Sequence, residues 1–313
     1  MLGARDVERG EEARRAIVAA AGGGPGGDDP SIEFNVQVLP LDTSEMSSVR
    51  AFAFAVSKLH GAVDVVVGAA AEIGAQRRHT RVGIVDKGFA TNHLGLQSLL
   101  TQLEPALRAG AAGPSALLAE GEASQPRSRV VIVGSRLEAK GQVDCDALEC
   151  TRGEHIRDPR PESMQESSNP QSYRVLKGGK FEPMLHYADS KHANQLLATQ
   201  LAARWRAAGE RISVFSVTPG MVDTGLWRDF PLWYRALTYP VRAIGLRSAE
   251  EAAAGVVYAC TAAALEPAAL SGAYLSDGKE IEPSEPSQDA AKAARLYELC
   301  AWLIAREERG EQY

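Results

Sequence analysis

The sequence predicts one α/β domain in which helices cover both faces of a parallel sheet. Short β-rich runs alternate with helical stretches along the chain, which is the order of repeated strand and helix units. The run from Val130 to Val133 is apolar at every position, which is typical of a strand buried on both faces. The length of 313 residues and the 45% share of hydrophobic side chains suffice for one sizeable core. We therefore expect a single domain over residues 1–313.

These patterns place the strands and helices along the chain. The expected strands are Phe34–Leu39, Val63–Val67, Arg129–Gly134, Ile212–Val217 and Ala273–Leu275. The expected helices are Val7–Ala20, Ser47–Leu59, Gly88–Ala109, Tyr187–Ala207 and Ala249–Ala264. Turn-forming and charged residues predict surface insertions at about 22–30, 110–128 and 144–183.

Composition and charge exclude several classes of protein. The chain has 34 Lys and Arg against 40 Asp and Glu, a formal net charge of -6, which argues against general binding to nucleic acid or to anionic lipid. The four cysteines form no C-x-x-C pair, so neither a zinc site nor a disulfide framework is expected. No spanning helix and no targeting segment is evident, which leaves the cytoplasm as the default location and peripheral membrane contact open.

A tyrosine and a lysine carry the strongest chemical signal. Tyr187 and Lys191 lie four residues apart at the start of an expected helix, so both side chains lie on one face, one turn apart. A phenol loses its proton near pH 10, and a nearby cation is needed to stabilise the phenolate at neutral pH. Taken alone, such a short motif also occurs by chance.

Further segments occur in an order that resembles the short-chain dehydrogenase/reductase superfamily. They are Val63–Ala71, similar to the family's DVLVNNAG, Asn92–Gly95, similar to NHLG, Val131–Ser135, similar to the strand that ends in the catalytic serine, and Val217–Thr224, similar to the PGxVxT turn. Ser271–Lys279 and the helix containing Leu296–Glu298 resemble the retinol-dehydrogenase-like subgroup. The resemblance covers nearly the whole chain and implies a Rossmann-like doubly wound parallel sheet.

The resemblance implies a role for each matching residue. Tyr187 would exchange a proton with the substrate oxygen, and Ser135 would hydrogen-bond that oxygen. Lys191 would lower the pKa of the tyrosine and contact the nicotinamide ribose, and Asn92 would hold a water that connects Lys191 to solvent. The implied cofactor contacts are Arg5, Asp42, Ala70, Lys191, Pro219, Gly220, Val222 and Thr224.

The sequence departs from the family's pattern at its beginning. The family's first strand and TGxxxGxG turn have no counterpart, and Met1–Asp6 resembles the end of the second strand. We expect an N-terminally truncated member, and whether that reflects an incomplete gene model stays open. An arginine at the place of Arg5 meets the 2′-phosphate of NADP in such proteins, so NADP is the expected cofactor and NAD stays open. The turn at Gly68–Ala71 also lacks the family's two asparagines.

Three functional hypotheses follow from these observations. The first is an NADP(H)-dependent enzyme that interconverts an alcohol and a carbonyl on a small apolar substrate of the retinoid, steroid or aldehyde kind. The alternatives are a non-catalytic remnant that acts as a binding or interaction protein, and an epimerase or dehydratase with the same Tyr/Lys pair. Aromatic and aliphatic residues in Pro231–Pro240 predict a lid, a membrane-facing patch or a packed helix. A homo-oligomer is left open, and no nucleic acid partner is expected.

Overall fold

The computed structural model describes residues 1–22, 35–74, 85–113, 128–150, 182–222, 246–265 and 268–311. Its elements, in chain order, are β1 (Leu2–Ala4), α1 (Val7–Gly22), β2 (Val38–Pro40), α2 (Met46–His60), β3 (Val65–Gly68), α3 (Lys87–Phe89), the π-helical turn η1 (Ala90–Leu94), α4 (Gly95–Ala112), β4 (Ser128–Val133), the 3₁₀ turn η2 (Arg136–Lys140), α5 (Cys145–Cys150), α7 (Pro183–Ala207), β5 (Ile212–Thr218), α9 (Ala249–Thr261), the 3₁₀ turns η4 (Ala263–Leu265) and η5 (Ala268–Leu270), β6 (Tyr274–Ser276), β7 (Lys279–Ile281), the 3₁₀ turn η6 (Glu285–Gln288) and α10 (Ala290–Arg309).

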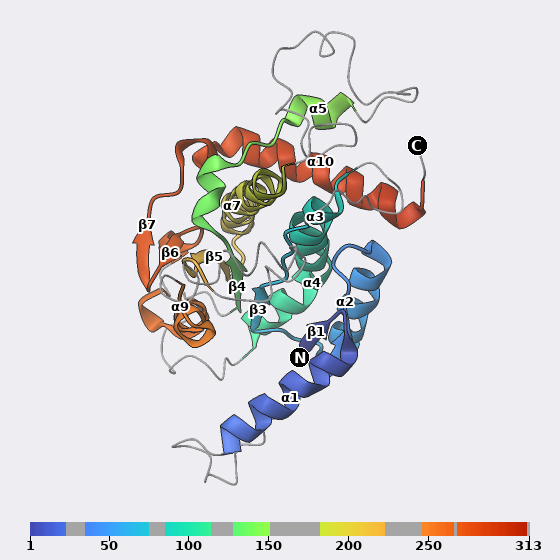
Figure 1. Ribbon diagram of the computed structural model, residues 1–313, viewed down its shortest axis with the longest axis vertical. Coiled ribbons are helices and arrows are strands. Elements are labelled where there is room, and N and C mark those ends of the chain that lie inside the picture. The colour runs from blue at the N-terminus through green and yellow to red at the C-terminus, as the bar shows by residue number, and fades with distance from the viewer. Residues whose placement is uncertain are drawn as a thin grey trace, which may run out of the picture.

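The central sheet has five strands in the order β3-β4-β5-β6-β7. Neighbouring strands from β3 to β6 are parallel, and β7 pairs antiparallel with β6. Figure 1 shows α4 and α7 on one face of this sheet, α9 on the other, and α10 running across α7 and α4. The predicted α/β fold with a parallel sheet between helical layers is confirmed.

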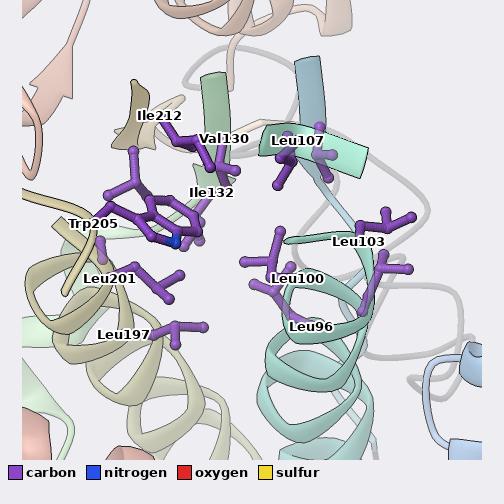
Figure 2. Close-up of a cluster of buried hydrophobic side chains, with 14 of the residues drawn as sticks. Leu96, Leu100, Leu103, Leu107, Val130, Ile132, Leu197, Leu201, Trp205 and Ile212 are labelled. Carbon is purple, nitrogen blue, oxygen red and sulfur yellow. The ribbon is translucent and has the colours of Figure 1, made fainter. Parts of the chain in front are cut away.

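A buried apolar cluster joins this sheet to the helices on one face. Leucines of α4 and α7, together with Trp205, pack on Val130 and Ile132 of β4 (Figure 2). Burial of each such side chain stabilises the fold by roughly 1.5 to 3 kcal/mol. The same cluster includes Val49 and Phe52 of α2, so the helical layer continues from α7 through α4 to α2.

The sheet itself is interrupted within the described residues. β1 and β2 form a separate parallel pair, in which Leu2 lies opposite Val38. β1 therefore pairs only with β2, and β3 pairs only with β4, in the part of the chain that the structure describes. The interruption lies between β1 and β3, which is where the resemblance places the family's first strand.

Several boundaries differ from the sequence-based expectation. The predicted insertion at 144–183 begins with the helix α5 (Cys145–Cys150), and α7 already starts at Pro183, since proline is favoured in a helix's first turn. α4 extends to Ala112, inside the predicted 110–128 insertion. Residues 23–34, 114–127 and 151–181, which hold most of the three predicted insertions, lie outside the described residues.

The hairpin of β6 and β7 was not predicted. Asp277 and Gly278 form its two-residue turn with φ values of 52° and 71°. Two central residues with positive φ match the turn that suits the twist of paired strands, and Asp-Gly is a strong sequence signal for it. The Asp-Gly pair within Ser276–Lys279 was therefore a signal in the sequence for this hairpin.

Candidate active site

The predicted catalytic residues meet at the carboxyl ends of the parallel strands. Ser135 follows β4 after one glycine, and Pro219 and Gly220 follow β5 directly. The first turns of α7 bring Tyr187 and Lys191 to the same edge. Ligands of open α/β sheets bind in the crevice outside the carboxyl ends of the strands, so this edge is the candidate site.

Tyr187 and Ser135 contact each other through their hydroxyl groups. Ser135 is the N-cap of η2, and its Oγ accepts a hydrogen bond of 3.2 Å from the backbone N–H of Leu137. Burial raises the pKa of Tyr187 to about 12, and the hydrogen bond with Ser135 acts in the opposite direction. Tyr187 is therefore a neutral phenol at physiological pH in the cofactor-free protein.

Lys191 is buried beside Tyr187, with its ammonium 5.4 Å from the centroid of the phenol ring. Its Nζ donates a hydrogen bond of 2.7 Å to the carbonyl oxygen of Val133, the last residue of β4. Burial lowers the pKa of Lys191 to about 8. The net pKa of Tyr187 is raised because its burial outweighs the effects of its neighbours, and the lowering expected from Lys191 stays a prediction.

Asn92 connects the turn after β3 to α7. It lies in the π-helical turn η1 and is buried. Its Oδ1 accepts from Glu72 N at 2.8 Å, and its Nδ2 donates to Glu72 O and to Ser190 Oγ, both at 3.0 Å. Its backbone carbonyl accepts from Asn194 Nδ2 at 3.0 Å. Asn92 therefore links the backbone of the turn after β3 to side chains of α7, and its predicted role in holding a water stays a prediction.

The predicted adenine-side residues follow β1 and β2. Arg5, after β1, forms an ion pair with Glu72, with Nη1 and Oε2 3.6 Å apart. Asp42, after β2, accepts hydrogen bonds from Ser44 N at 2.9 Å and Ser44 Oγ at 2.7 Å. Ala70 is exposed in the turn after β3. All three lie at the same carboxyl edge as the Tyr187 pair, and the interruption in the sheet separates Arg5 and Asp42, but not Ala70, from that pair.

The remaining predicted cofactor residues follow β5. Gly220 has a φ of 81°, a conformation that favours glycine, and Pro219 O accepts from Arg247 Nη1 at 3.4 Å. Val222 forms a β-bridge with Arg247. Thr224 lies outside the described residues, as does the Pro231–Pro240 segment.

Comparisons with known proteins agree with this geometry. A mouse polyprenol dehydrogenase is 30% identical over 297 residues, which are 95% of this chain and 73% of the mouse protein. The chain belongs to the short-chain dehydrogenase/reductase family. Human dehydrogenase/reductase SDR family member 13 is 27% identical, over 95% of this chain and 64% of that protein, so the chain spans less than two thirds of this relative. No protein-family model matches the chain.

Solved structures share the family fold. A protein from Mycobacterium paratuberculosis has a TM-score of 0.62 at 23% identity, covering 97% of this chain and 82% of that one. The NADPH-bound carbonyl reductase from chicken fatty liver has a TM-score of 0.53 at 17% identity, covering 89% and 85%. The expectation of an oxidoreductase family with a Rossmann-like sheet is therefore confirmed.

The sequence did not predict a buried hydrogen-bond network that lies beside the candidate active site. Glu138, in η2, accepts hydrogen bonds from Ser284 N, Ser284 Oγ and Ser287 Oγ at 3.0, 2.6 and 2.6 Å. Ser287 Oγ is also 2.8 Å from Nδ1 of His192, the neighbour of Lys191 on α7. The network ties the turn after Ser135 to α7. His192 is fully buried and is part of this scaffold.

The described residues limit two other kinds of site. No group of three or more His, Cys, Asp or Glu residues in the described part of the chain could hold a metal ion. None of the described helices combines the length and apolar character needed to cross a membrane.

Proposed function

We propose that this chain is an NADP(H)-dependent oxidoreductase that interconverts an alcohol and a carbonyl on a small apolar substrate of the retinoid, steroid or aldehyde kind. One observation carries the proposal: Ser135, Tyr187 and Lys191, from segments far apart in sequence, meet at the carboxyl edge of the sheet. Because the catalytic roles come from the family resemblance, they stay proposals for this chain.

Each of the three side chains has a role in the proposed reaction. The nicotinamide, when bound, supplies or accepts the hydride. Ser135 hydrogen-bonds the substrate oxygen and Tyr187 exchanges a proton with it. Because the pKa of Tyr187 is about 12, the phenol is protonated and able to donate at neutral pH, which favours carbonyl reduction. Lys191, whose pKa is about 8, is largely charged at neutral pH and would contact the nicotinamide ribose.

The residues at the carboxyl edge fit a nicotinamide dinucleotide. Lys191 and the Pro219–Gly220 turn would hold the nicotinamide half, and Asp42 and Ala70 the adenine side. Val222 and Thr224 would meet the carboxamide and the pyrophosphate. Arg5, with about half of its side chain exposed, would bind the 2′-phosphate of NADP. Its ion pair with Glu72 competes with that role, so NAD remains the second candidate.

A relative supports the apolar substrate class. The mouse relative is named a polyprenol dehydrogenase, and polyprenols are long apolar alcohols. We keep the retinol-dehydrogenase-like subgroup and a lid or membrane contact at Pro231–Pro240 as parts of this proposal. We also keep the cytoplasm as the proposed location, with peripheral membrane contact, and leave a homo-oligomer open.

The second candidate is a non-catalytic protein that keeps the scaffold for binding. The interruption between β1 and β3 favours it, because this part of the sheet adjoins the proposed adenine side. The test is NADPH oxidation by the purified chain with retinal, a steroid ketone and a long-chain aldehyde, at saturating cofactor. Turnover of one apolar carbonyl that is lost in Tyr187→Phe supports the enzyme. A cooperatively folded chain without turnover would favour the binding protein.

A further inference from the structure

A second tyrosine lies beside the proposed reaction centre. Tyr274, the first residue of β6, pairs in register with Ser216 of β5, which pairs with Ile132 of β4. Register partners in a parallel sheet project from the same face. Ile132 belongs to the cluster packed against α7, so Tyr274 projects towards the helix that carries Tyr187.

The ring of Tyr274 lies against the residue before Ser135. A Cβ at Gly134 would lie 3.5 Å from Tyr274 Cε2 and 3.0 Å from Ser216 Oγ. A side chain at position 134 would therefore occupy the space next to the ring. The ring of Tyr274 thus packs beside Gly134, whose neighbour in sequence, Ser135, contacts Tyr187.

The hydroxyl of Tyr274 is buried in a cluster of hydroxyls without partners. Tyr274 is 3% exposed, and its Oη has no hydrogen-bond partner in the part of the chain that the structure describes, nor do Ser216 Oγ and Thr218 Oγ1. A buried polar group without a partner costs roughly 1 to 3 kcal/mol, and such groups commonly bind an ordered water. The cluster therefore has the capacity to hydrogen-bond a water or a reacting group.

Electrostatic interactions connect this hydroxyl to the catalytic tyrosine. Burial raises the pKa of Tyr274 to about 12, Thr218 and Arg136 lower it, and Glu138 raises it further. The Thr218 hydroxyl is thus close to Tyr274 although the two do not reach ideal hydrogen-bond geometry. A charged Tyr274 would raise the pKa of Tyr187, but below pH 10 Tyr274 is neutral and acts only as a dipole and a donor.

We propose that Tyr274 is a positioning residue for Tyr187: its buried hydroxyl donates a hydrogen bond, through one bound water, that stabilises the phenolate of Tyr187. This inference rests on the proposed function of Tyr187. In this proposal Tyr187 has two hydroxyl partners: Ser135, which follows β4, and Tyr274, which lies in β6. Loss of the donor disfavours the phenolate, so it slows alcohol oxidation, which needs the phenolate, more than carbonyl reduction.

The test compares the wild type with Tyr274→Phe, which removes only the hydroxyl. Tyr297→Phe is the matched control, because its hydroxyl bonds to Arg204 on α7, in a contact with α10 away from the site. In Tyr274→Phe the apparent pKa that limits alcohol oxidation should rise by about one unit, as expected for loss of one hydrogen bond to a charged group. The thermal midpoint should stay within a few degrees of the wild type, since the deleted hydroxyl has no hydrogen-bond partner among the described residues.

A second readout does not depend on turnover. Fluorotyrosine lowers the phenol pKa, so fluorine NMR of the labelled, cofactor-free protein can follow ionisation of Tyr187, assigned by its loss in Tyr187→Phe. The Tyr187 resonance should titrate at higher pH in Tyr274→Phe and remain at the wild-type value in Tyr297→Phe. An unchanged titration in Tyr274→Phe overturns the inference. Absent turnover in the wild type, together with a shifted titration, would instead overturn the proposed function alone.

Discussion

Arg5 and Glu72 form an ion pair across the interruption in the sheet, with Nη1 and Oε2 3.6 Å apart. Arg5 follows β1 and Glu72 lies in the turn after β3, so the pair joins the two sheets at their carboxyl edge. Glu72 is also fixed through its backbone by Asn92. The arginine proposed for the cofactor phosphate is therefore held by a carboxylate that is itself anchored to the catalytic side.

This pairing predicts the effect of removing the Glu72 charge. In Glu72→Gln, Arg5 loses its anionic partner and becomes available to the 2′-phosphate of NADPH. Arg5 is half-exposed, and its ion pair with the buried Glu72 is long at 3.6 Å, so we take its worth as about 1 kcal/mol. NADPH affinity should then rise roughly two- to fivefold, while NADH affinity stays constant. Fluorescence titration with both cofactors measures the ratio. Arg5→Gln should lower NADPH affinity, and an unchanged ratio in both variants would show that Arg5 does not read the phosphate.

The interruption in the sheet predicts a specific pattern of amide exchange. Val65–Gly68 of β3 pair only with β4, so in a parallel ladder alternate amides of β3 lack a strand partner in the described structure. Those amides should exchange much faster than their neighbours and than the central strand β4. Hydrogen exchange followed by NMR measures this. Uniform protection along β3 would mean that another segment of chain fills the interruption in solution.

Lys191 predicts a rise in stability at alkaline pH. Its pKa is about 8 in the folded state against 10.5 for the model side chain. Between these values the unfolded chain binds more protons than the folded one, so the free energy of unfolding rises with pH. Above pH 10 the raised pKa of Tyr187 acts in the opposite direction. Lys191 should contribute roughly 1 to 3 kcal/mol to a rise from pH 8 to pH 10, measured as the difference in slope between the wild type and a variant without the ammonium. The raised pKa values of the Cys145, Cys260 and Cys300 thiols act against this rise in both proteins.

Urea unfolding across this pH range measures the rise. Lys191→Met should remove the part of the slope that Lys191 causes, because position 191 then carries no titrating group, while the opposing slope of the buried thiols remains. Lys279→Met, at an exposed lysine of β7, is the control and should keep the wild-type rise. If Lys191→Met retains the same slope, the ammonium is not the group that causes it.

The sequence predicts the catalytic set because its members occur in ordered local motifs. Tyr187 and Lys191 lie one helical turn apart, and Ser135 ends an apolar run, so each can be recognised from its neighbours. The strands β3, β4 and β5 are equally visible, since their apolar runs are almost continuous. These parts of the fold and the site depend on short-range patterns.

The contacts between distant segments could not be predicted in the same way. Tyr274 reaches Gly134 only through the register of β5 and β6, and Glu138 meets Ser284 and Ser287 through the packing of the segment before α10. Nothing near these residues in sequence specifies the partner. The effect of burial on the pKa of Tyr187 could not be predicted from local sequence either, because that burial depends on distant segments of the chain.

The most direct test of the proposed mechanism is carbonyl reduction at saturating NADPH by the wild type and by Tyr187→Phe. General acid catalysis is worth about 10²- to 10⁴-fold, so the variant should lose that factor in kcat while its NADPH dissociation constant changes by less than a few-fold. Tyr297→Phe should keep wild-type kcat. Wild-type turnover in Tyr187→Phe would contradict the assignment of Tyr187 as the residue that donates the proton.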